Sequence, residues 1–545
     1  MAPTFKVLIA GAGLGGITLA ILLEKAQIDY DLFESSPQVS PLGSAIVLGP
    51  SIFPLLEQLG LLDKVDKISK PVQTIHLVQD NLKRIGELDL SDHKDRTGYA
   101  SRVSTRTDLL SLLISQLDPK RVHFSKQIVS FSQNKDSAEI RCADHTTYKG
   151  DILVGSDGAF SRIRTCLYKQ VAKKGILPRH DAALFSALPS IADNGGLEEG
   201  VFQPTGSHFS LVGVTDPLDR NRYPGLQDAE SRCDTIVVDH ITFGYYTLPG
   251  DRIAWTVHMH LEDPALREHY AQPQQLQRPP SPTPSTMSYA SSSTTASYAS
   301  TVSYIPGGWE PEEKVKGLAT VGELLSEEYQ HLKLPIGGLF RDLMNATPPQ
   351  SVTRTVSEEF LCETWHHGRT VLIGDACHGL LPNAGQGAAS AMLDSVILAN
   401  LLHDLPSASP EHVVELFKAF QADRLPFAKV QMDLSHRVNK VLLSSPTSPS
   451  SPLGSGPFGS SVLSSSPPTS SSPPSGHGSW TDSWMRKLMV RYLSKVYQHF
   501  SDAKTLADRP QAAFLPLIPN RGSTAPLPQR TPKVYSASTA SGTKH

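Results

Sequence analysis

A glycine-rich stretch near the N-terminus has residue types and spacing suited to holding a pyrophosphate. Gly11-Ala12-Gly13-Leu14-Gly15-Gly16 fits the pattern G-x-G-x-x-G, and Glu34 follows 18 positions after Gly16. In such a loop Gly11 makes a tight turn, Gly13 lets the backbone approach the phosphates, and Gly16 lets a helix pack closely on a strand. An acid near the position of Glu34 bonds a ribose 2′-hydroxyl and repels a 2′-phosphate. The pattern therefore predicts a dinucleotide site that favours FAD or NAD over NADP.

The elements around this loop must form a βαβ unit to place it. We expect a strand over residues 7–10, a helix over 17–25 and a second strand over 30–33 that ends at Glu34. The run between Lys6 and Glu24 has no charge, so a membrane anchor or a signal peptide is an alternative. The fixed glycine spacing and the following acid argue against both, and the helix N-terminus would then face the pyrophosphate.

Two further stretches repeat the theme of a strand that ends at a polar turn. In "DILVGSDGAFSRIR" an apolar strand over 152–154 reaches Asp157-Gly158, and a helix with Arg162 and Arg164 follows; alone, this is an ordinary turn. In "RTVLIGDACHGLLPNAGQG" a strand over 370–373 reaches Gly374-Asp375, and Gly385-Gln386-Gly387 opens a long apolar helix. That helix N-terminus is a second place to stabilise an anion.

Together these stretches resemble the FAD-dependent aromatic hydroxylases, the single-component flavoprotein monooxygenases related to p-hydroxybenzoate and salicylate hydroxylases and to plant and fungal epoxidases. "DGAFSRIR" is similar to the family motif DGxxSxxR, and "GDACHGLLPNAGQG" is similar to GDAxHxxxPxxGQG. "STRTDLLSLL" supplies the family's arginine, Arg106, before a leucine-rich helix. The resemblance covers roughly residues 5–402. Residues 509–523 also look like the end of fungal members, some of which oxidise prenylated or terpenoid metabolites.

The resemblance implies where the cofactor would be held. Asp375 would bond a ribityl or ribose hydroxyl of FAD, and Arg106 would lie along the pyrophosphate. Asp157 and Arg164 are implied to serve NADPH or NADH as well as FAD, and residues 385–388 would point N–H groups at the flavin. Two positions depart from the family pattern, since Ala389 replaces an asparagine and Cys377 a smaller residue. The expected cofactor residues are Gly11, Gly13, Gly16, Glu34, Val47 (through its backbone), Arg106, Asp157, Gly158, Arg164, Gly374, Asp375, Gly385, Gly387 and Ala388.

The reaction implied by the resemblance is a monooxygenation. NADPH or NADH reduces FAD, O2 adds at the flavin C4a, and the hydroperoxide gives one oxygen atom to a small apolar or aromatic metabolite of secondary metabolism. Two alternatives stay open: a flavin oxidase or dehydrogenase without oxygen insertion, and a degenerate flavoprotein that serves as a binding module. No catalytic base is assigned, because His378 follows the family's structural histidine and Tyr245, Tyr246 and His258 are only candidates. Phe209, Phe243, Tyr245 and Trp255 either line the substrate pocket or form the core of a sheet.

We expect an α/β protein with a Rossmann-type FAD-binding domain and a substrate domain with a largely antiparallel sheet. Strand-like alternation over 201–214, 235–248 and 252–261, with a turn at 249–251, carries the second expectation. The FAD-binding domain is assigned to residues 1–70, 100–178 and 355–442, and the substrate domain to 71–99 and 179–354. Residues 272–308 and 444–479 are rich in Ser and Pro and read as disordered insertions. We assign 480–519 to a C-terminal helical segment and 520–545 to a flexible tail.

Composition limits the partners and the compartment. The 50 basic and 53 acidic residues give a net charge of −3, which does not suggest nucleic acid or an anionic membrane as a general partner. The five cysteines lack metal-ligand spacing, which favours a reducing, cytoplasmic setting, and no metal site is expected. Residues 484–500 have a basic amphipathic pattern that either docks on the protein's own core or makes peripheral membrane contact.

Overall fold

The computed structural model describes residues 5–38, 44–187, 208–238, 241–260, 327–357, 359–382, 385–443 and 503–528. The stretches 272–308, 444–479 and 484–500, on which three of the sequence interpretations depend, lie outside these ranges. Within the described ranges, no helix combines the length and the apolar character needed to cross a membrane.

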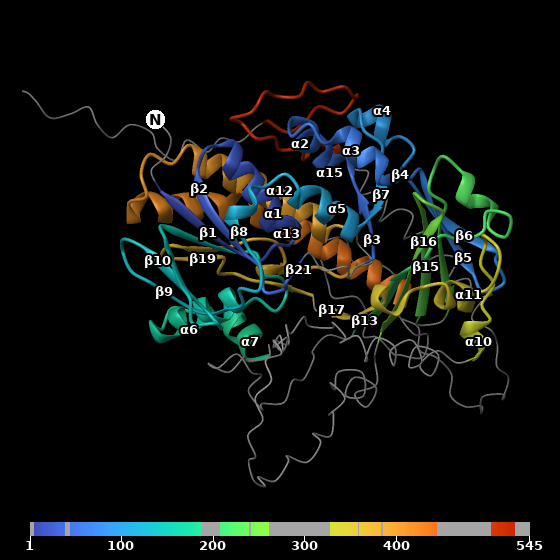
Figure 1. The fold of residues 1–545 in the computed structure, drawn as a ribbon, viewed down its shortest axis with the longest axis horizontal. Coiled ribbons are helices and arrows are strands. Elements are labelled where there is room, and N and C mark those ends of the chain that lie inside the picture. The colour runs from blue at the N-terminus through green and yellow to red at the C-terminus, as the bar shows by residue number, and fades with distance from the viewer. Residues whose placement is uncertain are drawn as a thin grey trace, which may run out of the picture.

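A six-stranded, mainly parallel sheet forms the centre of the nucleotide-binding part (Figure 1). Its order is β19-β20-β12-β1-β2-β8, and only β19 runs antiparallel to its neighbour. The inner strands β1 and β12 are runs of buried aliphatic residues, which is typical of a parallel sheet covered on both faces. The strands are β1 Lys6–Ala10, β2 Asp29–Phe33, β8 Val122–His123, β12 Ile152–Gly155, β19 His366–His367 and β20 Thr370–Leu372.

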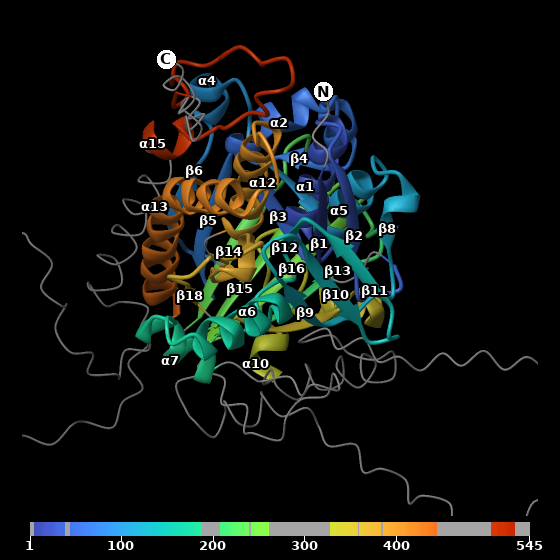
Figure 2. The ribbon, with the colours of Figure 1, turned by 90° about the vertical axis from the view of Figure 1, so that its left-hand side faces the viewer.

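Three long helices pack against this sheet and against one another (Figure 2). Helix α1 (Leu14–Lys25) begins three residues earlier than expected, so the last two glycines of the loop lie in its first turn. It packs along α12 (Gly387–His403), and α12 contacts α13 (Pro410–Leu443). Helix α13 buries Val413, Leu416, Phe417 and Phe420, the spacing of one helix face. The remaining helices of this part are α2 Phe53–Gln58, α3 Leu62–Lys67, α4 His93–Thr97, α5 Arg106–Ile114, α6 Arg162–Lys173 and α7 Arg179–Ala187.

The second large sheet has seven strands in the order β17-β13-β16-β15-β14-β5-β6. All neighbours are antiparallel except β14 and β5, so the expected largely antiparallel sheet is confirmed. The single strand expected over 235–248 is wrong, because the chain forms two paired strands there, with Val238 opposite Ile241. The turn at 249–251 is present, with Gly250 and Asp251 at positive φ. The strands are β5 Thr74–Gln79, β6 Arg84–Asp89, β13 His208–Val214, β14 Cys233–Val238, β15 Ile241–Leu248, β16 Arg252–His260 and β17 Thr353–Ser357.

The two faces of this sheet have different neighbours. On the outer face, Phe243 and Trp255 pack edge-on against Phe340 of α11 (Phe340–Asn345). On the inner face, Leu248 and Ala254 pack against Val103 and Val47 of a small antiparallel sheet. That small sheet contains β3 Ala45–Leu48, β4 Ser69–Pro71 and β7 Arg102–Thr105, in the order β3-β7-β4.

Helix α7 follows the assigned domain boundary at residue 178 in the sequence, yet it packs on the nucleotide-binding part. It packs on α6, and the Asp181 carboxylate accepts the main-chain N–H groups of Glu363 and Thr364 at 2.8 and 2.7 Å. The seven-stranded sheet itself takes its strands only from residues 74–89 and 208–357. The other described elements are β9 Ile128–Gln133, β10 Ala138–Cys142, β11 Thr147–Gly150, α10 Glu327–Gln330, β18 Phe360–Leu361 and β21 His378–Gly379.

The C-terminal strap, residues 503–528, crosses the top of the molecule beside α2 and α4 (Figure 1). Its only described helix is α15 (Ala503–Ala507), so a helical segment through 519 is wrong. Gln58 and Asn400 each bind the strap's main chain through both amide atoms, the first at Ala512 and the second at residues 511 and 513. Thr524 and Leu527 also hydrogen-bond, so residues 520–527 do not form the flexible tail that the sequence predicts there.

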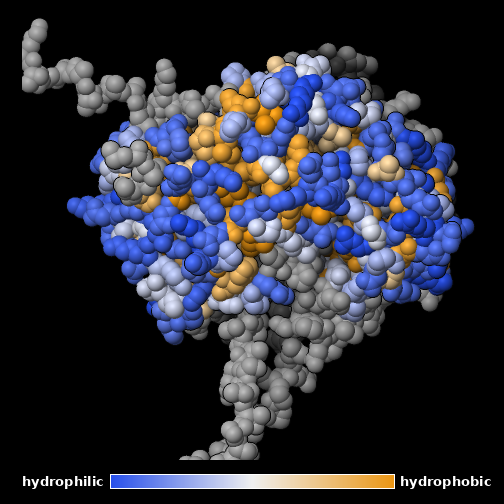
Figure 3. Space-filling model, turned by 45° about the horizontal axis from the view of Figure 1, so that its top comes forward, coloured by the Kyte–Doolittle hydropathy of each residue, from blue (hydrophilic) through white to orange (hydrophobic). Residues whose placement is uncertain are grey.

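The surface above α1 and α12 mixes polar and apolar side chains. Apolar residues gather in a band down the middle of this face, with polar regions on either side (Figure 3). Among the described residues, the large apolar side chains that are more than a third exposed are Leu82, Ile176, Val430 and Leu517, which lie on four separate segments.

Candidate functional site

The glycine loop between β1 and α1 has the geometry of a phosphate cradle. Gly11 has φ +99°, and a Cβ there would lie 2.5 Å from the Ser156 carbonyl oxygen, so only glycine fits. Gly13 is the N-cap of α1, and no side chain caps that helix end. A Cβ at Gly13 would meet nothing closer than 4.0 Å, which leaves open space in front of the helix N-terminus. The loop therefore offers N–H groups and a positive helix dipole to an anion.

Glu34 lies at the end of β2 and faces this loop. Its Oε2 accepts the Ala12 N–H at 2.9 Å, and its Oε1 accepts the Ser36 N–H at 2.8 Å. The carboxylate is partly exposed. Its position beside the loop is the one that the sequence predicts for an acid that bonds a ribose hydroxyl.

Arg106 links the first motif to the third. It begins α5, its N–H donates to the Ser44 carbonyl at 2.9 Å, and its guanidinium is attracted by Asp375 and Glu34. Burial lowers the pKa of Arg106, and the two carboxylates oppose that effect. The side chain keeps some accessible surface, so it lies deep but within reach of a ligand.

Asp375 has the same combination of depth and access. Its surface is exposed, yet the surrounding protein raises the pKa of the carboxyl against the attraction of His378 and Arg106. The two observations agree, because surrounding walls desolvate a carboxyl group even while its tip still meets solvent. Arg106 is attracted by both Glu34 and Asp375, so the three charged side chains lie near one another, and we call the space between them the recess.

The N-terminus of α12 lies next to Asp375. A Cβ at Gly387 would come within 3.8 Å of the Asp375 carboxylate, and the N-cap residue Gln386 makes no capping bond from its side chain. Gly385 has φ +64° with nothing within 4 Å of a Cβ, and Gly387 and Ala388 are partly exposed. A second uncapped helix N-terminus thus opens toward the recess.

The structure buries Arg164, which does not favour its expected role as a direct nucleotide contact. Its side chain is 1% exposed, donates to the Ala376 carbonyl at 2.9 Å and lies 4.6 Å from the centre of the Phe360 ring. Arg164 therefore holds the second and third motifs together from inside the protein. Asp157 accepts the Ile163 N–H at 3.0 Å and receives the Ser161 hydroxyl, which fixes the start of α6, while Asp157 and Gly158 remain partly exposed.

Of the remaining expected cofactor residues, one is accessible and two are buried. Val47 lies on β3 and is partly exposed. Gly16 is buried, and a Cβ there would meet the Gly11 carbonyl oxygen at 2.0 Å, so it permits the helix to pack but offers no surface. Gly374 is buried as well, with φ +58° and its N–H held by Asp394.

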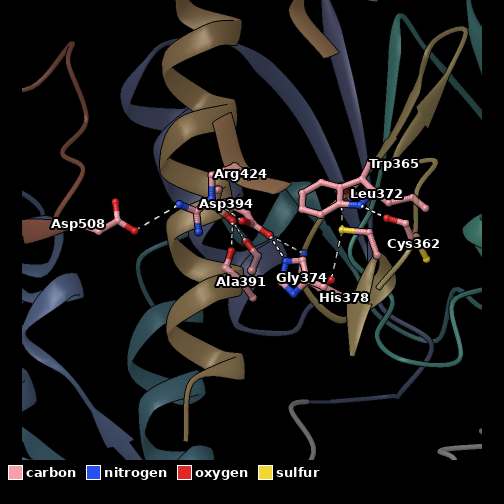
Figure 4. A network of polar contacts seen from close by, with 12 residues as sticks. Cys362, Trp365, Leu372, Gly374, His378, Ala391, Asp394, Arg424 and Asp508 are labelled. Atoms are coloured by element: carbon pink, nitrogen blue, oxygen red, sulfur yellow. Dashed lines mark hydrogen bonds and ion pairs between the residues drawn. The ribbon is translucent and has the colours of Figure 1, made fainter. Parts of the chain in front are cut away.

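A buried polar network behind the recess was not predicted. The Asp394 carboxylate bonds the Gly374 N–H, His378 Nε2 and Arg424 Nε, at 2.9, 2.7 and 2.8 Å, and Arg424 reaches Asp508 of the strap at 3.5 Å (Figure 4). A usable signal was present, because Asp394 and Arg424 interrupt apolar helical faces, where a charge needs a partner. Ser44, whose hydroxyl is buried without a partner among the described residues, was also missed.

On the sheet side, the aromatic candidates for the substrate pocket form core instead. Phe209, Phe243, Tyr245 and Trp255 are at most 1% exposed, and Tyr245 donates to Asp234. They lie on the outer face, under α11. The inner face carries Ser210, Thr242 and His258 at the alternate positions, and the Ser210 hydroxyl lies 2.7 Å from His258 Nδ1. Burial lowers the pKa of His258 to about 4, so this histidine is neutral near pH 7.

These residues fit FAD. The glycine cradle and two uncapped helix N-termini suit a pyrophosphate and a reduced flavin, Arg106 adds a cation, and Glu34 and Asp375 suit ribose or ribityl hydroxyls.

Comparisons with known proteins agree with this fit. A family model described as FAD binding domain matches residues 4–210 and 331–435. The FAD-dependent monooxygenase ctvC of Aspergillus terreus is 26% identical over 406 residues, which is 74% of this chain and 70% of that protein. The FAD-dependent monooxygenase olcE of Penicillium canescens is 25% identical over 441 residues, or 80% of this chain and 79% of that protein.

Solved structures show the same fold at lower identity. The 2,6-dihydroxypyridine-3-hydroxylase of Arthrobacter nicotinovorans superposes with a TM-score of 0.56 at 20% identity, covering 85% of this chain and all (100%) of that one. Klebsiella pneumoniae HpxO, solved with FAD and uric acid, gives a TM-score of 0.52 at 18% identity, covering 80% of this chain and 90% of that one. The chain belongs to the FAD-binding-domain family of flavin-dependent monooxygenases and is an oxidoreductase.

Proposed function

We propose that this enzyme uses NADPH or NADH to insert one oxygen atom from O2 into a small apolar or aromatic metabolite, with prenylated or terpenoid compounds of secondary metabolism as the first candidates. The single observation that carries the proposal is the convergence of Glu34, Arg106 and Asp375 with the N-termini of α1 and α12. Its fungal relatives are FAD-dependent monooxygenases. Bound FAD supplies the chemistry that accepts electrons from the nicotinamide and activates O2.

The residues of the recess bind and orient the cofactor. The first N–H groups of α1 take the negative pyrophosphate, and Arg106 neutralises part of its charge. Glu34 and Asp375 accept hydrogen bonds from hydroxyl groups of the cofactor, and these directional bonds orient it. Arg106 also offsets the repulsion between these carboxylates and the phosphates, since it is attracted by both acids.

The N-terminus of α12 favours the reduced cofactor. Its residues Gly387 and Ala388 present main-chain N–H groups that the side chain of the N-cap residue Gln386 does not cap. A reduced flavin carries more negative charge than an oxidised one, so these fixed dipoles stabilise it more strongly.

The inner face of the seven-stranded sheet is the proposed substrate wall. Its Leu248 and Ala254 pack against β3 and β7 of the nucleotide-binding part. Side chains two residues apart on a strand lie on the same face and are separated by about 7 Å along the strand. Thr242, His258 and Ser210 therefore lie on the same face at about 13–20 Å from that contact. Ser210 and Thr242 are each 1% exposed, so this wall keeps water out, and the neutral His258–Ser210 pair gives a substrate oxygen a hydrogen-bond partner.

The proposal is tested with purified full-length enzyme, in two stages. Anaerobic addition of NADPH, and separately of NADH, should bleach the flavin absorption bands. Under 18O2, a panel of aromatic and terpenoid compounds should then yield a product that is heavier by one 18O atom, with NAD(P)H consumed in step.

The outcomes separate this function from its alternatives. Bleaching with hydrogen peroxide as the sole oxygen product for every compound would favour a flavin oxidase. Flavin that neither nicotinamide reduces, with or without the compounds, would contradict the use of NAD(P)H. Failure to bind FAD would leave only the binding-module alternative.

A further inference from the structure

Asp394 is the centre of the buried network behind the recess. It lies two turns into α12, is 1% exposed, and accepts hydrogen bonds at both carboxylate oxygens (Figure 4). Oδ2 bonds the Gly374 N–H at 2.9 Å and His378 Nε2 at 2.7 Å, while Oδ1 bonds Arg424 Nε at 2.8 Å. None of these groups belongs to the surface that a cofactor would touch.

The two groups on Oδ2 bracket Asp375. Gly374 enters the turn in a left-handed conformation, and a Cβ there would meet Ala391 of α12 at 2.8 Å. His378 leaves the turn, whose middle is closed by the Cys377 N–H on the Gly374 carbonyl at 2.9 Å. A single oxygen of Asp394 thus fixes both ends of the turn that carries Asp375. Because Asp394 belongs to α12, it also fixes Asp375 relative to the N-terminus of that helix.

The positive charge of Arg424 stabilises the buried Asp394 carboxylate. Burial raises the pKa of Asp394, but the attraction of His378 and Arg424 outweighs it and lowers the pKa to about 2. The carboxylate is therefore ionised near pH 7, where both of its oxygens accept hydrogen bonds. Arg424 is 3.5 Å from Asp508, which adds a second negative partner from the strap.

A metal site is the competing explanation for this cluster. Ligand atoms of Cys377, His378 and Asp394 lie within 4.8 Å of one another. However, both oxygens of Asp394 and Nε2 of His378 are already used, and the Cys377 thiol donates to the Leu372 and Gly374 carbonyls. Burial also raises the pKa of that thiol well above its ordinary value, which disfavours the thiolate that a metal requires. Most ligand atoms of the cluster are thus engaged in hydrogen bonds, and only Nδ1 of His378 is buried without a partner among the described residues.

We propose that Asp394 is a positioning residue for the cofactor: it sets the direction of the Asp375 carboxylate and its distance from the N-terminus of α12. This inference rests on FAD occupying the recess. Asp394→Asn is the direct test, because an amide of the same shape must turn its NH2 group toward Arg424 or toward Gly374 and His378, which are donors. The aligned turn is then lost while the volume is kept.

Asp181→Asn is the matched control. Asp181 is also a fully buried carboxylate (0% exposed) that accepts two main-chain N–H groups, but those belong to residues 363 and 364. Both variants should lower the unfolding temperature of the apoprotein. Only Asp394→Asn should raise the FAD dissociation constant, by about tenfold or more, and change the visible circular dichroism of the bound flavin.

Equal FAD dissociation constants and equal flavin dichroism in the two variants would overturn the proposal. If Asp394→Asn does not fold, Arg424→Lys decides, because it keeps the charge but moves the donor away from Oδ1; we expect a rise of about threefold in the FAD dissociation constant. An unchanged constant and spectrum in Arg424→Lys would overturn the proposal in that case. Absence of FAD binding in the unmodified enzyme would instead contradict the function itself.

Discussion

The two large sheets keep their polar groups in different places. In the six-stranded sheet, polar groups gather beyond the strand ends: Glu34 follows β2, Asp157 follows β12, and Asp375 follows β20. In the seven-stranded sheet, the polar side chains of Ser210, Thr242 and His258 lie within the strands and share the inner face. A parallel sheet is covered on both faces, so it binds a ligand beyond the carboxyl ends of its strands. An antiparallel sheet can instead use the side chains of one face to form one side of a substrate site.

This difference separates two kinds of residue. Changes beyond the ends of the parallel strands should alter the cofactor, and changes on the inner face of the antiparallel sheet should alter the substrate. Changes on its outer face should alter only stability. A change in one region should therefore leave the property that belongs to the other region unaltered.

The largest effect is expected from Phe243→Ala on the outer face. Phe243 is 1% exposed and packs against Phe340 with ring centres 5.1 Å apart. Removing the ring should lower the free energy of unfolding by about 3–5 kcal/mol, measured by denaturant titration. The FAD dissociation constant should not change. Thr242→Ala, the control on the inner face, should cost less stability and change substrate affinity; the reverse pattern would contradict the assignment of the faces.

Arg106→Gln should come next, with its effect confined to the cofactor. It removes the cation between Asp375 and Glu34, so the FAD dissociation constant should rise about 10- to 100-fold. Fluorescence titration of the apoprotein with FAD measures this directly. Arg84→Gln, at a half-exposed position of β6, is the control and should leave the constant unchanged. Loss of affinity in both variants would point to a general charge effect.

A pair of histidines provides a test with matched pH dependence. Burial lowers the pKa of His258 and of His366 to about 4 from the ordinary 6.5, one in each sheet. Because the unfolded chain binds a proton at higher pH than the folded one, each contributes stability that is complete above pH 6.5 and is lost as the pH falls toward 4. Replacing either by Gln should flatten the pH dependence of unfolding in that window, by up to about 1.4 kcal/mol per pH unit.

Only one of the two should affect the substrate. His258→Gln should change the Michaelis constant or release hydrogen peroxide, because His258 lies on the inner face. His366→Gln should leave both unchanged. Identical kinetic behaviour of the two variants would remove His258 from the substrate wall.

The smallest effect is expected where the two regions meet. Arg252 of β16 bonds Asp108 of α5 at 2.9 Å, with side chains 30% and 32% exposed. Such a pair is screened by solvent, so Arg252→Gln should cost about 0.5 kcal/mol of unfolding free energy and leave the FAD dissociation constant unchanged. A loss of several kcal/mol would show that this ion pair, rather than apolar packing, joins the regions.

The cofactor half was largely predictable because its signals are local. A positive φ at Gly11, an uncapped helix at Gly13 and an acid after a strand are each encoded within a few residues. The burial of Arg164 was not predictable, because motif spacing says nothing about burial, and the structure turns its side chain inward to the Ala376 carbonyl. Asp394 and Arg424 could not be paired from spacing, since they lie on different helices.

The substrate half was less predictable because a strand's side chains change face at each residue. Phe243 and Tyr245 were sensible pocket candidates by type, but the pairing of β15 with β16 and the cover by α11 place them outside. The break between β14 and β15 also carried no Gly or Pro signal. Contacts between distant segments decide these features, as they decide where the strap docks.

Flavin binding by the purified enzyme tests the central claim most directly. Incubation with excess FAD, followed by desalting, should leave stoichiometric flavin with quenched fluorescence, and anaerobic NADPH or NADH should bleach its absorption. A preparation that is folded by circular dichroism yet retains no FAD, and quenches none in a titration, would contradict the assignment of the recess between Glu34, Arg106 and Asp375.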